Sequence, residues 1–171
     1  MEGFLNPTDV LKNLKLKEDM KAADFGSGSG GWVFPLAKKL EIGKIYAIDI
    51  QEEPLSALRA KANLFKIENV ETMQADIEKG TNLLEESLDL VLITNLLFEV
   101  QDKEAVLKEA KRVLKEKGRI LIVDWAKDNP LTKEIERISE KEIKDIAKKL
   151  QLKTEKEFTA GLYHFCLVLV K

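Results

Sequence analysis

AADFGSGSGG, at residues 22–31, joins a short apolar run to an acid and then to a glycine-dense loop. A helical pattern opens directly after it, at residues 32–37. Glycine accepts positive φ and has no Cβ, so such a loop lets backbone N–H groups approach a nucleotide-type ligand. Asp24 precedes the loop, and Asp49 closes the next apolar run roughly 20 residues further on, where a carboxylate can bind ribose hydroxyls. This order predicts a nucleotide-binding strand–loop–helix unit.

Two interpretations fit this loop. Gly26, Gly28 and Gly31 match the G-x-G-x-x-G fingerprint of dinucleotide-binding folds. The segment from Asp24 to Gly30 also resembles the D/E-x-G-x-G-x-G motif of class I S-adenosylmethionine-dependent methyltransferases. The loop alone leaves both interpretations open, so the rest of the chain has to separate them.

Composition and charge are typical of a globular protein with one core. The chain has 171 residues, 44% hydrophobic and 34% charged, which predicts a single domain over residues 1–171. A net charge of −2 does not indicate nucleic-acid binding, which needs a strongly positive surface. The longest apolar run, residues 88–100, is interrupted by polar side chains and is too short for a membrane span. No signal peptide is visible at the start, and we expect a cytoplasmic protein.

Cys166 is the only cysteine. A single cysteine excludes an internal disulfide and a cysteine-cluster metal site. We expect it to be a buried small apolar residue of a strand, and we expect no metal.

Strand and helix patterns alternate along most of the chain. Near-continuous apolar strands indicate a parallel sheet that helices cover on both faces. The short join at residues 159–161 predicts an antiparallel hairpin at the sheet edge. Strands are expected at residues 21–25, 45–50, 70–75, 88–94, 119–125, 153–158 and 163–170, and helices at 9–14, 31–40, from Pro54 with Leu55, Leu58, Ala62 and Phe65 buried, from Asp102 through Leu114, and from Ser139 to about Leu150.

This order of elements resembles the class I methyltransferase fold over almost the whole chain. The resemblance is closest to the small-molecule branch that includes ubiquinone- and menaquinone-biosynthesis methyltransferases. The L-K-P-G-G turn and following strand of that branch correspond to LKEKGRIL at residues 114–121, with Glu116 and Lys117 replacing proline and the first glycine. The resemblance implies an α/β fold: a doubly wound, Rossmann-like seven-stranded sheet, mostly parallel with an antiparallel last strand and helices on both faces.

The same resemblance favours a methyltransferase over an NAD-linked oxidoreductase. We expect no second, catalytic domain after the nucleotide-binding half, and Asp76 has a role after the third strand only in the methyltransferases. The implied cofactor is S-adenosylmethionine. Asp24 would orient its ammonium end, the Gly26–Gly30 backbone would lie against its methionine portion, and Asp49 would bind the ribose hydroxyls.

Further cofactor contacts follow from the resemblance. Ile50 and Ile77 would cover the two faces of the adenine ring, and Asp76 would meet its amino group. Asn95 would line the sulfonium. The alternative for Asp76 is a helix cap, and for Asn95 an ordinary polar residue at a strand end. The expected cofactor-binding set is Asp24, Phe25, Gly26, Ser27, Gly28, Gly30, Asp49, Ile50, Asp76, Ile77 and Asn95.

The acceptor pocket is expected where strands four and five end and the antiparallel last strand begins. Phe4, Phe98, Trp125 and Tyr163 are predicted to line it. His164, the only histidine, is the candidate general base, because its ordinary pKa suits that role. A structural histidine at the sheet edge is the alternative.

The apolar segment after strand four, TNLLF at residues 94–98, favours a small apolar or aromatic acceptor over a nucleobase. Two other functions stay open: a protein or RNA methyltransferase with an open site, and a non-catalytic S-adenosylmethionine-binding protein. The chain has almost no insertion that would act as a lid, so the N-terminal segment or the partner of a homodimer would have to cover a small-molecule site.

Overall fold

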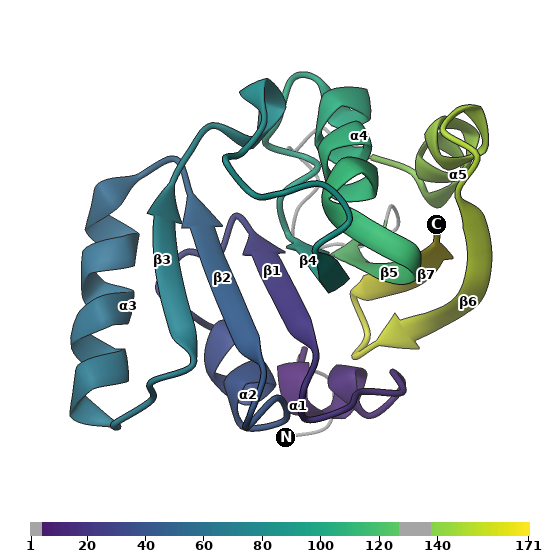
Figure 1. Cartoon of the computed structure of the whole chain (residues 1–171). Coiled ribbons are helices and arrows are strands. Elements are labelled where there is room, and N and C mark those ends of the chain that lie inside the picture. The colour runs from purple at the N-terminus through teal and green to yellow at the C-terminus, as the bar shows by residue number, and fades with distance from the viewer. Residues whose placement is uncertain (1–4, 127–137) are drawn as a thin grey trace.

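A seven-stranded sheet organises the computed structural model, which describes residues 5–126 and 138–171. The strand order is β3-β2-β1-β4-β5-β7-β6 (Figure 1). β1 to β5 pair in parallel, and β7 runs antiparallel to both β5 and β6. The strands are β1 (Lys21–Phe25), β2 (Lys44–Asp49), β3 (Val70–Gln74), β4 (Leu88–Thr94), β5 (Leu114–Trp125), β6 (Lys153–Ala160) and β7 (His164–Val170).

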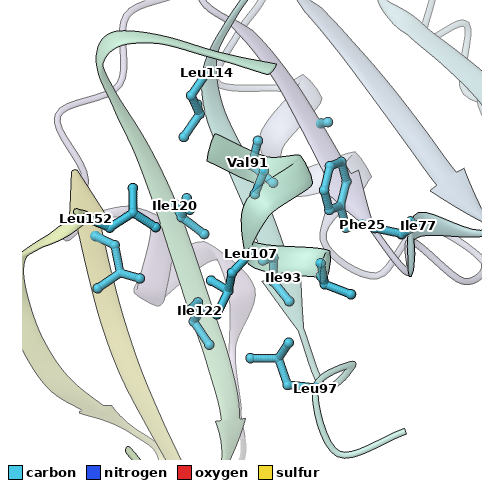
Figure 2. Packing of buried hydrophobic residues seen from close by; sticks show 14 of the residues in the cluster. Phe25, Ile77, Val91, Ile93, Leu97, Leu107, Leu114, Ile120, Ile122 and Leu152 are labelled. Carbon is cyan, nitrogen blue, oxygen red and sulfur yellow. The ribbon is translucent and has the colours of Figure 1, made fainter. Parts of the chain in front are cut away.

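Helices cover both faces of this sheet, as predicted. Alternate residues of β5 divide between two apolar clusters: Leu121 and Val123 pack with α1 and α2, and Ile120 and Ile122 pack with α4 and α5. Figure 2 shows Leu107 of α4 close to the apolar side chains of β4 and β5. The helices are α1 (Pro7–Leu11), α2 (Val33–Ala37), α3 (Glu52–Leu64), the 3-10 helix η1 (Ile77–Lys79), α4 (Lys103–Val113) and α5 (Glu140–Lys149).

Asp102 and Ser139, from which two helices were expected to run, are the N-caps of those helices. The Asp102 side chain accepts a hydrogen bond from Ala105 N at 2.8 Å and begins α4. Ser139 Oγ accepts from Glu142 N at 3.1 Å and begins α5. Such caps satisfy backbone donors that the first helical turn leaves free.

The predicted placements of Phe65 and Leu114 are wrong. Phe65 was expected on the buried side of its helix, but α3 ends at Leu64 and the Phe65 side chain is 63% exposed, with an edge-on contact to Phe34 at 6.4 Å between ring centroids. Leu114 was expected to end a helix; it begins β5 instead, paired with Leu88. In both cases apolar spacing continued past the point where the helix stops.

The glycine loop lies at the point of the sheet where the order of strand addition reverses. β2 and β3 follow β1 on one side, and β4 and β5 lie on the other, so the crossovers diverge between β1 and β4. Ligands of open α/β sheets bind outside the carboxyl ends of the strands at such a switch point. The fold therefore places residues 26–31 at the position where a ligand is expected.

Gly30→Ala tests how this loop is packed. Gly30 has a φ of +94°, and a Cβ there would lie 2.6 Å from Phe34 Cε2 and 3.2 Å from Leu58 Cγ. We expect Gly30→Ala to lower the free energy of unfolding by about 1–3 kcal/mol in urea denaturation, because the side chains of α2 and α3 would have to move.

Gly31→Ala is the matched control. Its Cβ would meet nothing within 4 Å. The change should stay within about 0.5 kcal/mol. Equal effects of the two substitutions would contradict this account of the loop.

Candidate functional site

Backbone hydrogen bonds tie the glycine loop to the end of β2. Gly26 N and Ser27 N both donate to Ile48 O, at 2.8 and 2.9 Å. Gly28 N donates to Asp49 Oδ2 at 2.9 Å, and Gln51 N donates to Asp49 Oδ1 at 3.0 Å. The Asp49 carboxylate thus holds the glycine loop with one oxygen and the segment that leads to α3 with the other.

A cavity of about 580 Å³ opens between this loop and the segments that follow β2, β3 and β4. Such a volume suits a nucleoside-sized ligand. The structure brings together most of the predicted cofactor residues here. Those that line the cavity are Gly26, Ser27, Gly28, Asp49, Ile50, Asp76, Ile77 and Asn95.

Three predicted cofactor residues lie outside the cavity wall. Phe25 is fully buried in the cluster under α4, which Figure 2 shows. Gly30 provides the space in which Phe34 and Leu58 pack. Asp24, one position before Phe25 in β1, is fully buried beneath the loop. Strand alternation sends Asp24 and Phe25 to opposite faces of the sheet.

Several lining residues were not predicted from the sequence. Ser29 and Gly31 lie within the glycine loop that the sequence marked, and the others lie at or after the ends of β1 to β4 with no motif of their own. The full set is Ser29, Gly31, Trp32, Gln51, Pro54, Ala75, Glu78, Thr94, Leu96, Glu99 and Val100.

Buried polar atoms without hydrogen-bond partners gather around this loop. Among the described residues they include both carboxyl oxygens of Asp24, Ser27 Oγ and Asn95 Oδ1. Buried polar atoms in folded proteins are almost always paired, because an unpaired one costs about 1–3 kcal/mol. Ser27 and Asn95 line the cavity and Asp24 does not, so the unpartnered acceptors of Ser27 and Asn95 indicate a place for a ligand that carries hydrogen-bond donors.

Asp24 is the most unusual titratable group of the site. Burial raises the pKa of its carboxyl from 3.8 to about 8, and the nearby charge of Asp49 adds to the effect. The carboxyl is therefore protonated at neutral pH. A positively charged donor beside it would favour the ionised form and lower the pKa again.

The segment after β4 forms another wall and is held by β5. Asn95 has a φ of +50°, in the left-handed region that non-glycine residues rarely adopt, and its N–H donates to Val123 O at 2.8 Å. Leu97 N donates to Asp124 Oδ2 at 3.2 Å, and Trp125 N donates to Asp124 Oδ1 at 2.8 Å. Burial raises the pKa of Asp124 to about 6. Asp124 was not a predicted site residue, although an acid at the end of an apolar strand was its signal.

Asp76 caps a helix, which was the alternative interpretation of this residue. Its Oδ1 accepts from Glu78 N at 3.1 Å and caps η1, and its Oδ2 pairs with Lys79 Nζ at 2.9 Å. The hydrogen bond from Lys79 lowers the pKa of the Asp76 carboxyl. Each carboxylate oxygen keeps a further lone pair, so a cap and a ligand contact are compatible.

The predicted acceptor residues lie on the neighbouring strands. Trp125 and His164 are cross-strand partners on β5 and β7, with ring centroids 4.1 Å apart. His164 is 6% exposed, its Nε2 has no partner among the described residues, and burial lowers its pKa. None of Phe98, Trp125, Tyr163 and His164 lines the cavity of the glycine loop. Phe4 lies outside the described residues.

Known proteins share both the sequence pattern and the fold. A family model described as a methyltransferase domain matches residues 16–160. The demethylmenaquinone methyltransferase of Staphylococcus aureus (strain MRSA252) is 29% identical over 151 residues, which cover 87% of this chain and 61% of that protein. The chain thus spans less than two thirds of that relative's length.

Solved structures give the same result for the fold. A SAM-dependent methyltransferase from Aquifex aeolicus superposes with a TM-score of 0.86 at 29% identity, covering 97% of this chain and 89% of that one. The cyclase SpnF superposes with a TM-score of 0.84 at 11% identity, covering 96% and 80% of the two chains, which shows a common fold alone.

The chain therefore belongs to the methyltransferase-domain family, and its resemblance to the class I S-adenosylmethionine-dependent methyltransferases is confirmed. The predicted Rossmann-like seven-stranded sheet is confirmed with it. S-adenosylmethionine is the cofactor that this family implies. Within the described part of the chain, no helix has the length and apolarity that crossing a membrane requires.

Asp24→Asn tests the buried carboxyl through the pH dependence of stability. Because the folded-state pKa of Asp24 is raised, the native protein holds a proton that the unfolded chain releases, and its stability falls as pH rises from about 4 to about 8. Asparagine removes this dependence. We expect the free energy of unfolding of Asp24→Asn, relative to the unmodified protein, to be clearly higher at about pH 8.5 than at about pH 5.

Urea denaturation at both pH values measures this difference. The contribution of Asp124 is the same in both proteins and cancels. A difference that does not change with pH would show that Asp24 is not protonated in the folded protein.

Proposed function

We propose that this chain binds S-adenosylmethionine in the cavity of the glycine loop and transfers the cofactor's methyl group to a small apolar or aromatic acceptor. The buried, unpartnered polar atoms around Asp24 support this proposal most strongly. They lie at the switch point where the family motif predicts the amino-acid end of the cofactor.

The residues at that end fit a cationic amino group. An ammonium group has three N–H donors and no acceptor. Asp24 offers two unpartnered carboxyl oxygens, and Ser27 and Asn95 each offer one more buried acceptor. A ligand ammonium would satisfy atoms that the protein leaves unpaired, and the ionised Asp24 would balance its charge.

The residues at the other end fit a nucleoside. Asp49 accepts two backbone hydrogen bonds and keeps lone pairs for ribose hydroxyls. Ile50, 58% exposed, and Ile77, buried, supply apolar surface for an adenine ring. Asp76, the N-cap of η1 directly before Ile77, keeps lone pairs that can accept from an exocyclic amine.

The bound cofactor supplies a methyl group that its sulfonium has already activated for transfer. The protein therefore has to align the reactants and exclude water rather than provide strong acid–base chemistry. Leu96 and Val100 give the cavity apolar walls, and Asp124 and Val123 hold the segment that carries them. Gly26 lets Leu96 approach the loop, because a Cβ there would lie 2.9 Å from Leu96 Cδ1.

His164 is the residue we propose as a base for acceptors that lose a proton. Burial lowers its pKa, so the imidazole is neutral at pH 7 and can accept a proton. The ring of Trp125 contacts the imidazole in a tilted arrangement, with ring centroids 4.1 Å apart. Phe98, Trp125 and Tyr163 would supply apolar and aromatic surface for the acceptor. The name of the Staphylococcus aureus relative, a demethylmenaquinone methyltransferase, supports an aromatic ring as the acceptor class.

Calorimetric titration tests the cofactor assignment directly. We expect S-adenosylmethionine and its demethylated product to bind, and NAD to bind far more weakly. Asp49→Ala should weaken cofactor binding by about 1–3 kcal/mol, since the ribose hydroxyls and Gly28 N both lose their acceptor.

Asp19→Ala provides the control, because Asp19 is an exposed acid in the turn before β1 and does not line the cavity. It should leave cofactor affinity unchanged. Preference for NAD, or equal effects of the two substitutions, would contradict the assignment.

His164→Gln tests the proposed base. With labelled cofactor and demethylmenaquinone as the first acceptor, we expect kcat at neutral pH to fall by about 10²-fold or more, on the scale of general-base catalysis, while cofactor affinity stays the same. In the unmodified protein kcat should rise with pH through a pKa below 6.5 and level off, since the neutral imidazole is the active form. If the histidine is structural, turnover will change only as far as stability does.

A further inference from the structure

A buried acid of α4 and its arginine partner lie outside the cavity wall and have no part in the proposed chemistry. Glu109 is 7% exposed, and its Oε1 accepts hydrogen bonds from Thr81 N at 2.8 Å and from Thr81 Oγ1 at 2.6 Å. Arg112 donates to the same carboxylate, from Nε to Oε2 and from Nη2 to Oε1, at 2.7 Å in each case. Burial alone would raise the pKa of Glu109, but the hydrogen bonds from Arg112 and Thr81 outweigh it and hold the pKa below its ordinary value. Glu109 is therefore ionised at neutral pH, with both of its oxygens hydrogen-bonded.

Arg112 extends this hold along the connection between β3 and β4. Its Nη2 also donates to Thr81 O at 3.2 Å and to Leu83 O at 2.9 Å. The Arg112 carbonyl accepts a hydrogen bond from Glu86 N at 3.1 Å. Across residues 75–87, which the structure describes throughout, η1 is the only helix. The rest of this connection is thus fixed to α4 by hydrogen bonds rather than by a helix of its own.

The Glu109 carboxylate also lies against the end of η1. Gly80 directly follows η1, and its N–H donates to Ile77 O at 3.1 Å. A Cβ at Gly80 would lie 3.6 Å from Glu109 Oε2, an ordinary contact distance. Ile77 in turn belongs to the apolar cluster that contains Phe25 (Figure 2). Glu109 therefore limits the position of η1 on the side of α4.

The start of α4 provides a second tie to η1. Glu78 Oε1 accepts from the N–H of Asp102, the N-cap of α4, at 2.6 Å. Asp76, Ile77 and Glu78 line the cavity of the glycine loop, whereas Glu109 does not. One helix thus determines from behind where this wall of the cavity lies.

We infer that Glu109 is a positioning residue for the cofactor: acting through Thr81 and η1, it holds Asp76 and Ile77 where they meet the adenine ring. This inference rests on the proposed function. Glu109 touches no ligand itself, because the segment from Asp76 to Thr81 separates it from the cavity.

An ion pair suits this task better than apolar packing would. Charge-assisted hydrogen bonds to a carboxylate and a guanidinium are short and directional, so they fix the place of a backbone segment as well as its burial. A hydrogen bond between Asp76 and a ligand amine would be lost if the segment moved by about 1 Å, because such bonds weaken steeply beyond their normal length. The precise position of η1 therefore decides how well the base is recognised.

Two ligands that differ in one group read out that position. They are the demethylated product of the cofactor, which carries adenine, and its deaminated form, in which an oxygen replaces the adenine amino group. Calorimetric titration gives the affinity of each. We expect the unmodified protein to prefer the adenine ligand by about tenfold or more, because the oxygen would face the Asp76 carboxylate without a proton between them.

Glu109→Gln tests the inference. Glutamine keeps the size of the side chain, but its amide NH₂ replaces an acceptor and faces the donors of Thr81 and Arg112. We expect the preference for the adenine ligand to fall to about threefold or less, through weaker binding of that ligand. Arg112→Lys keeps the charge and loses the planar fork that reaches Thr81 O and Leu83 O, so it should reduce the preference in the same direction.

Ile143→Ala is the control for a loss of stability alone. Ile143 is fully buried in α5 and has no part in these hydrogen bonds, so its truncation leaves a cavity in the core without touching the ion pair. It should leave the preference for the adenine ligand unchanged at a temperature where all the variants are folded.

The outcomes separate the two proposals. If the unmodified protein binds neither ligand, the proposed function itself fails. If it binds the adenine ligand, and Glu109→Gln and Arg112→Lys keep its affinity and its preference, cofactor binding stands and the positioning role is overturned. Equal affinities of the unmodified protein for the two ligands, or an equal loss of preference in Ile143→Ala, would overturn that role as well.

Discussion

A carboxylic acid buried without a partner at the end of β1 is the constraint around which the site is arranged. Asp24 has no solvent exposure, and neither of its oxygens has a hydrogen-bond partner among the described residues. An ionised carboxylate in such a place is so unfavourable that the group takes up a proton instead, and its pKa rises to about 8. The buried, unpaired carboxyl group is thus unfavourable for the fold, and it lies at the point of the sheet where the crossovers diverge. A ligand that brings a positive charge and hydrogen-bond donors to this position removes the cost.

Two loops hold the surroundings of Asp24 in place by backbone hydrogen bonds. The glycine loop is fixed to Ile48 and Asp49 of β2, and the segment after β4 is fixed to Val123 and Asp124 of β5. They meet where Leu96 packs against Gly26, at a distance that leaves no room for a Cβ. The positive φ of Asn95 is part of the same arrangement, since it turns the chain across the end of the sheet while its N–H stays bonded to β5. The segments that follow β1, β2, β3 and β4 thus line the cavity, and β5 holds the last of them in place.

Much of this could be predicted from the sequence, because apolar runs, glycines and capping residues act locally. β1 and β4 have their predicted limits, and Asp102 and Ser139 cap the helices that they were expected to cap. The acids Asp24 and Asp49 were identified from their order around the loop. Properties that depend on how segments meet were not predictable: Phe65 lies past a helix end that its spacing does not mark, and Asp124 acts through the backbone of a segment 27 residues away. The sequence assigned Trp125 and His164 to an acceptor pocket; they are cross-strand partners that do not line the cavity of the glycine loop, and that pocket stays a prediction.

The number of protons released when S-adenosylmethionine binds tests this account most directly. Titration calorimetry at about pH 6.5 in two buffers with different ionisation enthalpies measures that number, since protons that leave the protein are taken up by the buffer. Burial raises the pKa of Asp24 to about 8, and we propose that an ammonium group of the cofactor lies beside it in the complex; we therefore predict close to one proton released per cofactor bound, and none from Asp24→Asn. Tight binding with no proton release from the unmodified protein would contradict the claim that the cofactor's positive charge ionises Asp24.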